Sequence, residues 1–222
     1  MIVKVKFSKP TMDVPVNNQK ELNSYIHKCL GANNKFHDAF SDYCVSSLQG
    51  GKLDFSTGML YFEDVPYILF TTNNQEFTVQ FLNGIMKNEN TLFGMHYDGF
   101  EFSDFEVSNY FDKVFLVSPL LLKIKDKKIS VKDDNYLQLL KEHCIKKLAH
   151  NGIVDETFDI EIRNENKAKV KKIMVGDVFN ICSMVSFIIK GKKETRLKLY
   201  NLGLGTSTGS GFGFVKIYKK GE

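Results

Sequence analysis

The sequence predicts an α+β fold of two tandem ferredoxin-like (RRM-like) domains with a C-terminal glycine-rich loop. Three observations predict it: the order strand, helix, strand, strand, helix, strand in the first half, a less regular repeat of that order in the second, and a dense group of glycines near the end. We expect the first domain at residues 1–112 and the second at residues 113–222. The repetition rests on the order of elements alone, because no sequence repeat is visible.

The first half contains a strand whose apolar residues alternate with lysines at positions 2–7. A helix follows, with Asn17 or Asn18 as its N-cap, an apolar stripe that includes Leu22 and Ile26, and Gly31 as its end. The remaining expected elements are a short helix at 34–42, two hairpin strands at 58–61 and 67–71 joined by a turn at 63–66, a helix at 74–87 and a strand at 93–105.

The second half begins with an apolar strand from residue 113. A helix at 135–150 has one apolar face and ends at Gly152. The elements expected after it are a strand at 158–163, a basic segment at 164–172, strands around 173–175 and 180–190, a short helical region at 193–200 and a last strand at 214–218.

The glycine-rich loop lies within residues 201–218 and contains five glycines, with three hydroxyl residues at 206–208 between the first glycine pair and the rest. Glycine gives up side-chain packing and costs backbone entropy, so such a run indicates a bare backbone close to a bulky partner. A flexible tail is the alternative, although strand character resumes directly afterwards. Bare N–H groups favour an anion such as phosphate. Because the loop matches neither a Walker A site nor a dinucleotide fingerprint, a polynucleotide backbone is the favoured ligand.

Composition sets broad limits on function. The net charge of +4 permits nucleic-acid binding without requiring it. The four cysteines are far apart and have neither zinc-ligand spacing nor the density of a disulfide scaffold. No apolar run approaches membrane-spanning length and the N-terminus has no signal-peptide pattern, so we expect a soluble cytoplasmic protein without a membrane partner.

Three stretches together resemble one family. Residues 203–205 and 211–215 look like its C-terminal glycine loop and strand, residues 114–120 look like its strand at the domain junction, and residues 16–19 with the helix after them look like its first strand–helix passage. The family is that of the repeat-processing endoribonucleases of CRISPR systems, the Cas six family of the repeat-associated RNA-binding superfamily.

The resemblance implies metal-independent cleavage of precursor CRISPR RNA within the repeat, without a cofactor. The 2′-hydroxyl attacks the scissile phosphate, leaving a 2′,3′-cyclic phosphate and a 5′-hydroxyl. CRISPR repeat RNA is the implied partner. CRISPR effector subunits, and a second copy of the chain in a homodimer, are further candidate partners. Alternative functions are a non-catalytic repeat-binding subunit of an effector complex and an unrelated α+β enzyme that binds a small phosphorylated ligand at the loop.

Such cleavage needs a base, an acid and a cation for the developing phosphorane charge. The resemblance implies a histidine in the first helical region, and His37 and His27 are the candidates there, with Lys52 as the cation. Many family members have the key histidine at the end of the second helix, but residues 41–48 of this chain contain none.

The predicted RNA-binding residues fall into two groups. Basic side chains near the loop would neutralise the phosphate backbone; these are Arg163, Lys169, Lys171, Lys172 and Arg196. The loop itself would contribute Gly203, Gly205, Thr206, Ser207, Thr208, Gly209, Gly211 and Gly213.

Overall fold

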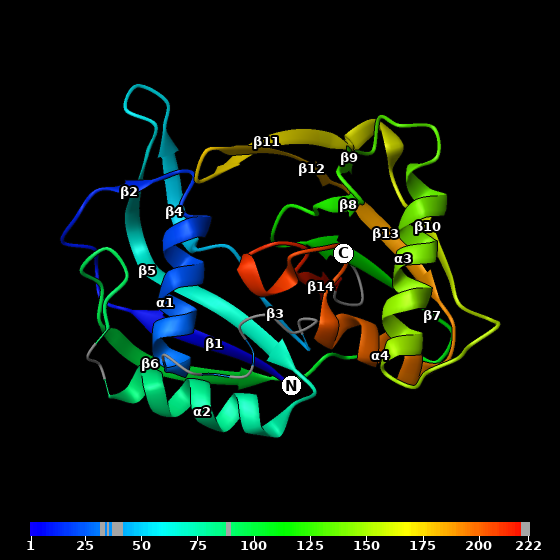
Figure 1. The fold of residues 1–222 in the computed structure, drawn as a ribbon, viewed down its shortest axis with the longest axis horizontal. Helices are drawn as coiled ribbons and strands as arrows, with labels where there is room; N and C mark the ends of the chain where they lie inside the picture. Colours follow the sequence, from blue (N-terminus) through cyan, green and yellow to red (C-terminus); the bar gives the residue numbers. More distant parts are fainter. Residues whose placement is uncertain (32–33, 35, 37–41, 88–89, 219–222) are drawn as a thin grey trace.

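The structure is a computed structural model that describes residues 1–31, 34, 36, 42–87 and 90–218. Two antiparallel sheets lie side by side, one from each half of the chain (Figure 1). The first half runs from blue to green and the second from green to red in that view. The glycine-rich loop lies between the two halves, close to the centre of the molecule.

The first sheet has the strand order of a ferredoxin-like fold. β1 lies between β5 and β6, and β3 and β4 both pair with β5, all antiparallel. Val3, Val5 and Phe7 of β1 share a core with both helices, which cover one face of the sheet. The elements are β1 (Ile2–Phe7), β2 (Val14–Pro15), α1 (Gln19–Leu30), β3 (Tyr43–Val45), β4 (Gln49–Asp54), β5 (Met59–Thr72), α2 (Gln75–Met86) and β6 (Tyr97–Ser103).

Both long helices of this half begin and end where the sequence predicts. α1 follows Asn18 and ends at Gly31, whose φ of 91° a residue with a side chain rarely adopts. Asn74 caps α2, because its side chain accepts a hydrogen bond from the Phe77 N–H at 3.1 Å. The short helix expected at 34–42 lies largely outside the described residues.

The prediction of a hairpin with its turn at residues 63–66 is wrong. β5 is one strand through this stretch, and its hairpin partner is β4. The register passes from Gln49 opposite Tyr67 to Gly51 opposite Phe62, so Gly50 alone faces the four residues 63–66. The turn-forming residues at 63–66 therefore form a bulge within the strand and not a hairpin turn. The hairpin turn lies at residues 55–58, where the Asp54 carboxylate accepts the Ser56 N–H at 2.8 Å.

The second sheet has the order β10-β13-β7-β14, which is the same ferredoxin-like order. Helices α3 and α4 share a core with Val114, Phe187 and Ile189 of this sheet. The tandem ferredoxin-like fold is thus confirmed. The elements are β7 (Phe111–Leu116), β8 (Leu122–Ile124), β9 (Lys127–Ile129), α3 (Tyr136–His150), β10 (Asp159–Ile162), η1 (Glu165–Lys167), β11 (Lys169–Val175), β12 (Val178–Met184), β13 (Ser186–Lys190), α4 (Lys193–Leu202), η2 (Thr208–Ser210) and β14 (Val215–Ile217).

The β11–β12 hairpin arches from the second half across to the first (Figure 1). Its tip is tied to the entry of α1, because the Asn17 side-chain oxygen accepts the Met174 N–H at 3.1 Å. Beneath it, Ile173 and Cys182 pack on Phe212 of the glycine loop. Part of the basic segment expected at 164–172 is thus the first strand of this hairpin.

The two halves share a hydrophobic core. Ile2 and Leu69, on the face of the first sheet away from its helices, belong to the same buried cluster as Leu199 and Tyr200 of α4. The expected boundary after residue 112 falls inside β7, and residues 104–110 connect β6 to β7. Among the described residues, no helix is long and apolar enough to cross a membrane.

Candidate functional site

The glycine-rich loop is packed inside the protein. A Cβ added at Gly213 would lie 1.8 Å from the Leu204 carbonyl oxygen, and one at Gly205 would lie 2.4 Å from that of Leu121. Both glycines have positive φ values, of 66° and 76°. The bulky partner that the glycine run predicted is therefore the protein itself. Of the predicted loop residues, Ser207 is exposed, Thr206 is half-buried and the others are buried.

Several backbone N–H groups of the loop are used within the protein. Leu204 N–H donates to Gly213 at 2.9 Å, Thr206 N–H donates to Leu121 at 2.7 Å, and Gly213 N–H donates to Pro119 at 3.0 Å. These groups hold the loop to itself and to the segment after β7. They are not available to a phosphate in this conformation.

The carbonyl groups of the loop surround a buried lysine of α3. Lys147 is 5% exposed, and its ammonium donates to the carbonyl oxygens of Leu202, Gly203 and Gly205 at 3.3, 3.1 and 2.9 Å. His143 Nε2, one turn earlier on α3, lies 2.9 Å from the same Gly205 oxygen. Burial lowers the pKa of Lys147, and burial with the nearby Lys147 charge lowers the pKa of His143 to about 4.

The other side of the loop rests on the first half of the chain. Cys44 Sγ lies 3.6 Å from the Phe212 carbonyl oxygen, and the Thr208 hydroxyl donates to the Tyr43 carbonyl at 3.3 Å. The Ser210 hydroxyl donates to the Asn23 side chain of α1 at 3.0 Å. Asn23 and His27 are four residues apart on this helix and therefore lie on one face.

The predicted catalytic residues occupy different elements. His27 lies on α1 and is half-buried. Lys52 lies on β4, and its exposed ammonium pairs with Glu63 of β5, an interaction that raises the Lys52 pKa. His37 lies outside the described residues. Of the two that the structure describes, His27 lies on α1, one of the elements that the glycine loop contacts, and Lys52 lies on β4.

Arg196, predicted to bind RNA, is an internal residue. It is 0% exposed, and its Nη1 lies 2.5 Å from Asp112 Oδ2. Its remaining donors reach the carbonyls of Gly191 at 3.0 Å and Ser108 at 2.6 Å. Tyr200 donates its hydroxyl to the same Asp112 oxygen at 2.9 Å. With its donors turned inward, Arg196 has none to offer an RNA phosphate, and the RNA-binding prediction fails for this residue.

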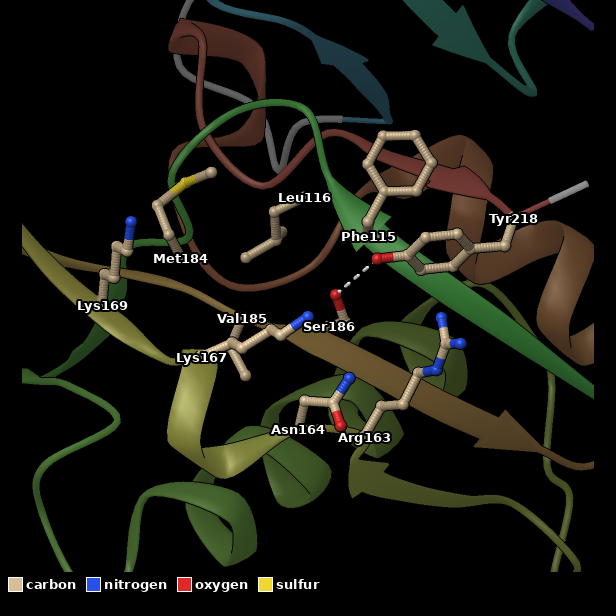
Figure 2. A pocket seen from close by; sticks show the side chains of 10 residues that line it. All are labelled: Phe115, Leu116, Arg163, Asn164, Lys167, Lys169, Met184, Val185, Ser186 and Tyr218. Carbon is tan, nitrogen blue, oxygen red and sulfur yellow. Dashed lines mark hydrogen bonds between the residues drawn. The ribbon is translucent and has the colours of Figure 1, made fainter. Parts of the chain in front are cut away.

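The other basic residues are on the surface, and two of them line a pocket. The pocket has a volume of about 390 Å³ and opens at one end of the second sheet (Figure 2). Arg163 and Lys169 line it together with Lys167. Lys171 and Lys172 lie farther along β11 and are exposed. The structure thus brings part of the predicted basic set together.

Aromatic rings complete this pocket. The Arg163 guanidinium lies 4.4 Å from the centre of the Tyr218 ring, and the Phe115 and Tyr218 ring centres are 4.9 Å apart. The Tyr218 hydroxyl and the Ser186 hydroxyl are 3.0 Å apart, and Figure 2 shows Arg163, Ser186 and Tyr218 converging. Cations beside half-exposed rings offer phosphate neutralisation and base stacking in one place. We call the residues Phe115, Arg163, Lys167, Lys169, Ser186 and Tyr218 the basic–aromatic pocket.

Sequence reasoning missed the rings and the buried lysine, although both left a signal. β7 alternates, with Asp112, Val114 and Leu116 buried, so Phe115 had to point away from the core. Lys147 stands in the apolar stripe of α3 formed with Leu140 and Cys144. A charged residue in such a stripe indicates an internal partner. No group of three or more potential metal-ligating side chains occurs in the part of the chain that the structure describes.

A family model described as CRISPR associated protein Cas6, C-terminal, matches residues 104–217, just over half of the chain. The chain belongs to this Cas6 family. The matched region contains the glycine loop, the β11–β12 hairpin and the basic–aromatic pocket. The comparison with curated proteins gives no match.

Solved structures resemble the whole chain. The product of a Cas6-related gene from Pyrococcus furiosus is 22% identical, with a TM-score of 0.83 and 99% of each chain covered. A RAMP protein described as binding different RNA substrates is 20% identical, with a TM-score of 0.82 over 99% of this chain and 100% of its own. A CRISPR associated protein Cas6 is 18% identical, with a TM-score of 0.80 and 99% of each chain covered. At these identities the likeness shows the fold.

Proposed function

We propose that this protein binds CRISPR repeat RNA and cleaves it within the repeat, by metal-independent attack of a 2′-hydroxyl on the adjacent phosphate. The observation that carries the RNA-binding part is the basic–aromatic pocket. A phosphate backbone would be neutralised by the exposed Lys167 and Lys169. An accessible base could stack beside the Arg163 guanidinium, which lies on the Tyr218 ring. Membership of the Cas6 family supports the choice of repeat RNA.

The cleavage step exchanges one phosphorus–oxygen bond for another. A base takes the proton of the 2′-hydroxyl, the 2′-oxygen bonds to phosphorus, and the bond to the 5′-oxygen breaks. An acid then protonates the leaving 5′-oxygen, so the products are a 2′,3′-cyclic phosphate and a 5′-hydroxyl. Imidazole suits both proton transfers because it titrates near neutral pH. We assign these transfers to His27 and His37, the two histidines in the first helical region.

The place of His27 supports this assignment. It lies on the face of α1 that carries Asn23, which accepts the Ser210 hydroxyl of the glycine loop. RNA lying along this junction would have its backbone beside an imidazole. Lys52 enters the proposal as the cation for the phosphorane. To act in that way, its ammonium must leave Glu63 for the phosphate. An exposed ion pair is weak enough for such an exchange.

The test is cleavage of end-labelled repeat RNA by the full chain in EDTA. We expect an unchanged rate in EDTA and products whose 5′-hydroxyl ends accept phosphate from a polynucleotide kinase without prior phosphatase treatment. His27→Ala and His37→Ala together should abolish cleavage. His96→Ala, which removes an exposed imidazole before β6, should leave the rate unchanged. Absence of cleavage by the wild-type chain under all conditions would refute the catalytic part.

The second candidate function is a non-catalytic repeat-binding subunit of a CRISPR effector complex. The observation that favours it is the ion pair that occupies Lys52 on an exposed hairpin. It predicts that repeat RNA binds with strong salt dependence and is recovered intact. It also predicts the same affinity for the wild-type chain and the variant that lacks both histidines, whereas a catalytic chain yields cut RNA.

A further inference from the structure

Lys147 is a buried lysine whose hydrogen-bond partners, in the part of the chain that the structure describes, are carbonyl oxygens rather than a carboxylate. An ammonium has three N–H donors, and three carbonyls within 3.3 Å can accept all of them. A buried cation is costly unless it is hydrogen-bonded, so these carbonyls determine whether the arrangement is stable.

The three carbonyls belong to the end of α4 and the start of the glycine loop. Leu202 is the last residue of α4, and Gly203 is its C-cap with a φ of 71°. The C-terminus of a helix has orphan carbonyls and a partial negative charge, which a lysine stabilises. Gly205 supplies the third carbonyl, two residues farther on, where the chain has already left the helix. The ammonium therefore hydrogen-bonds to both the end of the helix and the first residues of the loop.

The far side of the same loop meets the first half of the protein. Gly209 packs on the Tyr43 ring, where an added Cβ would approach a ring carbon to 2.8 Å. Gly211 packs on Leu22 of α1, and Ser210 hydrogen-bonds to Asn23. The loop is thus a short link between Lys147 on one side and the Asn23–His27 face of α1 on the other.

We propose that Lys147 is a positioning residue, whose ammonium holds the glycine loop in the conformation that fixes the junction between the loop and α1. The effect of Lys147 on the conformation of the loop does not depend on whether the protein cleaves RNA. Its effect on cleavage rests on the proposed function and on His27 acting at this junction. Lys147 does not touch RNA, since it is enclosed by the loop. Loss of its charge should therefore affect the turnover step rather than binding at the basic–aromatic pocket.

The experiment compares Lys147→Met with Lys146→Met, which removes the exposed lysine one residue earlier. The first readout is amide hydrogen exchange of residues 203–213 in the full chain. In Lys147→Met, we expect the Leu204, Thr206 and Gly213 amides to exchange at least about tenfold faster, while Lys146→Met matches the wild type. Unchanged protection in a folded Lys147→Met protein would overturn the proposal.

The second readout is single-turnover cleavage of repeat RNA alongside RNA affinity. Lys147→Met should lower the cleavage rate about 10- to 100-fold, because small displacements of reacting groups have such effects, and should leave the Kd within about twofold. Equal losses in the rate and in affinity, or no loss of rate, would refute the positioning role. If the wild-type chain does not cleave RNA, the proposed function fails, and the exchange measurement still decides the role of Lys147 in the loop.

A measurement on the wild-type chain covers the case in which Lys147→Met does not fold. Side-chain ammonium protons that are buried and hydrogen-bonded exchange slowly with water, so one lysine ammonium should give a ¹⁵N-correlated NMR signal at neutral pH. Through-bond correlation of that nitrogen along the side chain to the Lys147 backbone assigns the signal, and distinguishes it from Lys141 and Lys146 of the same helix. If every lysine ammonium exchanges as fast as an exposed one, Lys147 does not make its three hydrogen bonds to carbonyls, and the proposal fails.

Discussion

The glycine loop and two basic residues of the basic–aromatic pocket, Arg163 and Lys169, were predicted to bind RNA, and the structure gives the loop and the pocket opposite surroundings. The loop is buried between the two halves, and its carbonyls accept from the internal cation Lys147. The pocket is open, with Lys167 and Lys169 exposed and the Arg163 guanidinium on the Tyr218 ring. Glycine density here reflects close backbone packing, whereas the side chains that we propose to bind an anion have kept their access to solvent.

The two arginines of the chain show the same contrast in one residue type. Arg196 has its donors turned inward to Asp112 and two backbone carbonyls. Arg163 stacks on an aromatic ring at the rim of a pocket. A sequence cannot separate these roles by charge alone, because burial determines whether a cation stabilises the fold or binds a ligand.

Replacing Arg196 should damage the fold and spare RNA binding. Arg196→Met leaves the buried Asp112 carboxylate without its charged partner, so we expect a loss of about 3–5 kcal/mol in the free energy of unfolding. Urea denaturation measures this loss. Arg163→Met should change stability by less than about 1 kcal/mol and lower RNA affinity instead. Wild-type stability together with a loss of RNA affinity in Arg196→Met would contradict the assignment of Arg196 to the fold and of Arg163 to RNA binding.

The loop glycines should be intolerant of any side chain. Gly213→Ala places a Cβ against the Leu204 carbonyl at a positive φ, so we expect a loss of about 2–5 kcal/mol in unfolding free energy. Gly152 has a similar φ of 75°, but an added Cβ there would have nothing within 4 Å. Gly152→Ala should therefore lower the unfolding free energy by only about 1–2 kcal/mol. Thermal unfolding compares the two variants. Equal losses would mean that the loop is not tightly packed.

Acid should loosen the loop through His143. The folded protein keeps this imidazole neutral down to its pKa of about 4, while the unfolded chain takes up the proton near pH 6.5. The unfolded state thus binds more protons between these values, and stability falls as the pH is lowered from about 6.5 to 4. We expect His143 to account for about 1–2 kcal/mol of the loss between pH 7 and pH 5. Denaturation of His143→Gln should lack this component; an unchanged pH profile would contradict it.

The sequence predicted the repeated order of elements because helix caps and alternation are local signals. Asn18, Gly31 and Asn74 lie where the helices begin or end. The turn expected at 63–66 failed because the bulge opposite Gly50 depends on pairing with a strand distant in sequence. The candidate site was predicted in part. Arg163 and Lys169 meet in the pocket, but Lys147 and Tyr218 acquire their roles only through contacts between distant segments.

The most direct test of the account is the salt dependence of repeat-RNA binding by an Arg163→Ala, Lys167→Ala, Lys169→Ala triple variant. Lys123→Ala, Lys127→Ala, Lys132→Ala removes the same charge from exposed positions around the β8–β9 hairpin. If the pocket carries three phosphate contacts, the slope of log affinity against log salt should fall by about 2 in the pocket variant and stay close to the wild-type value in the other. Identical slopes in both variants would contradict the assignment of RNA binding to the pocket.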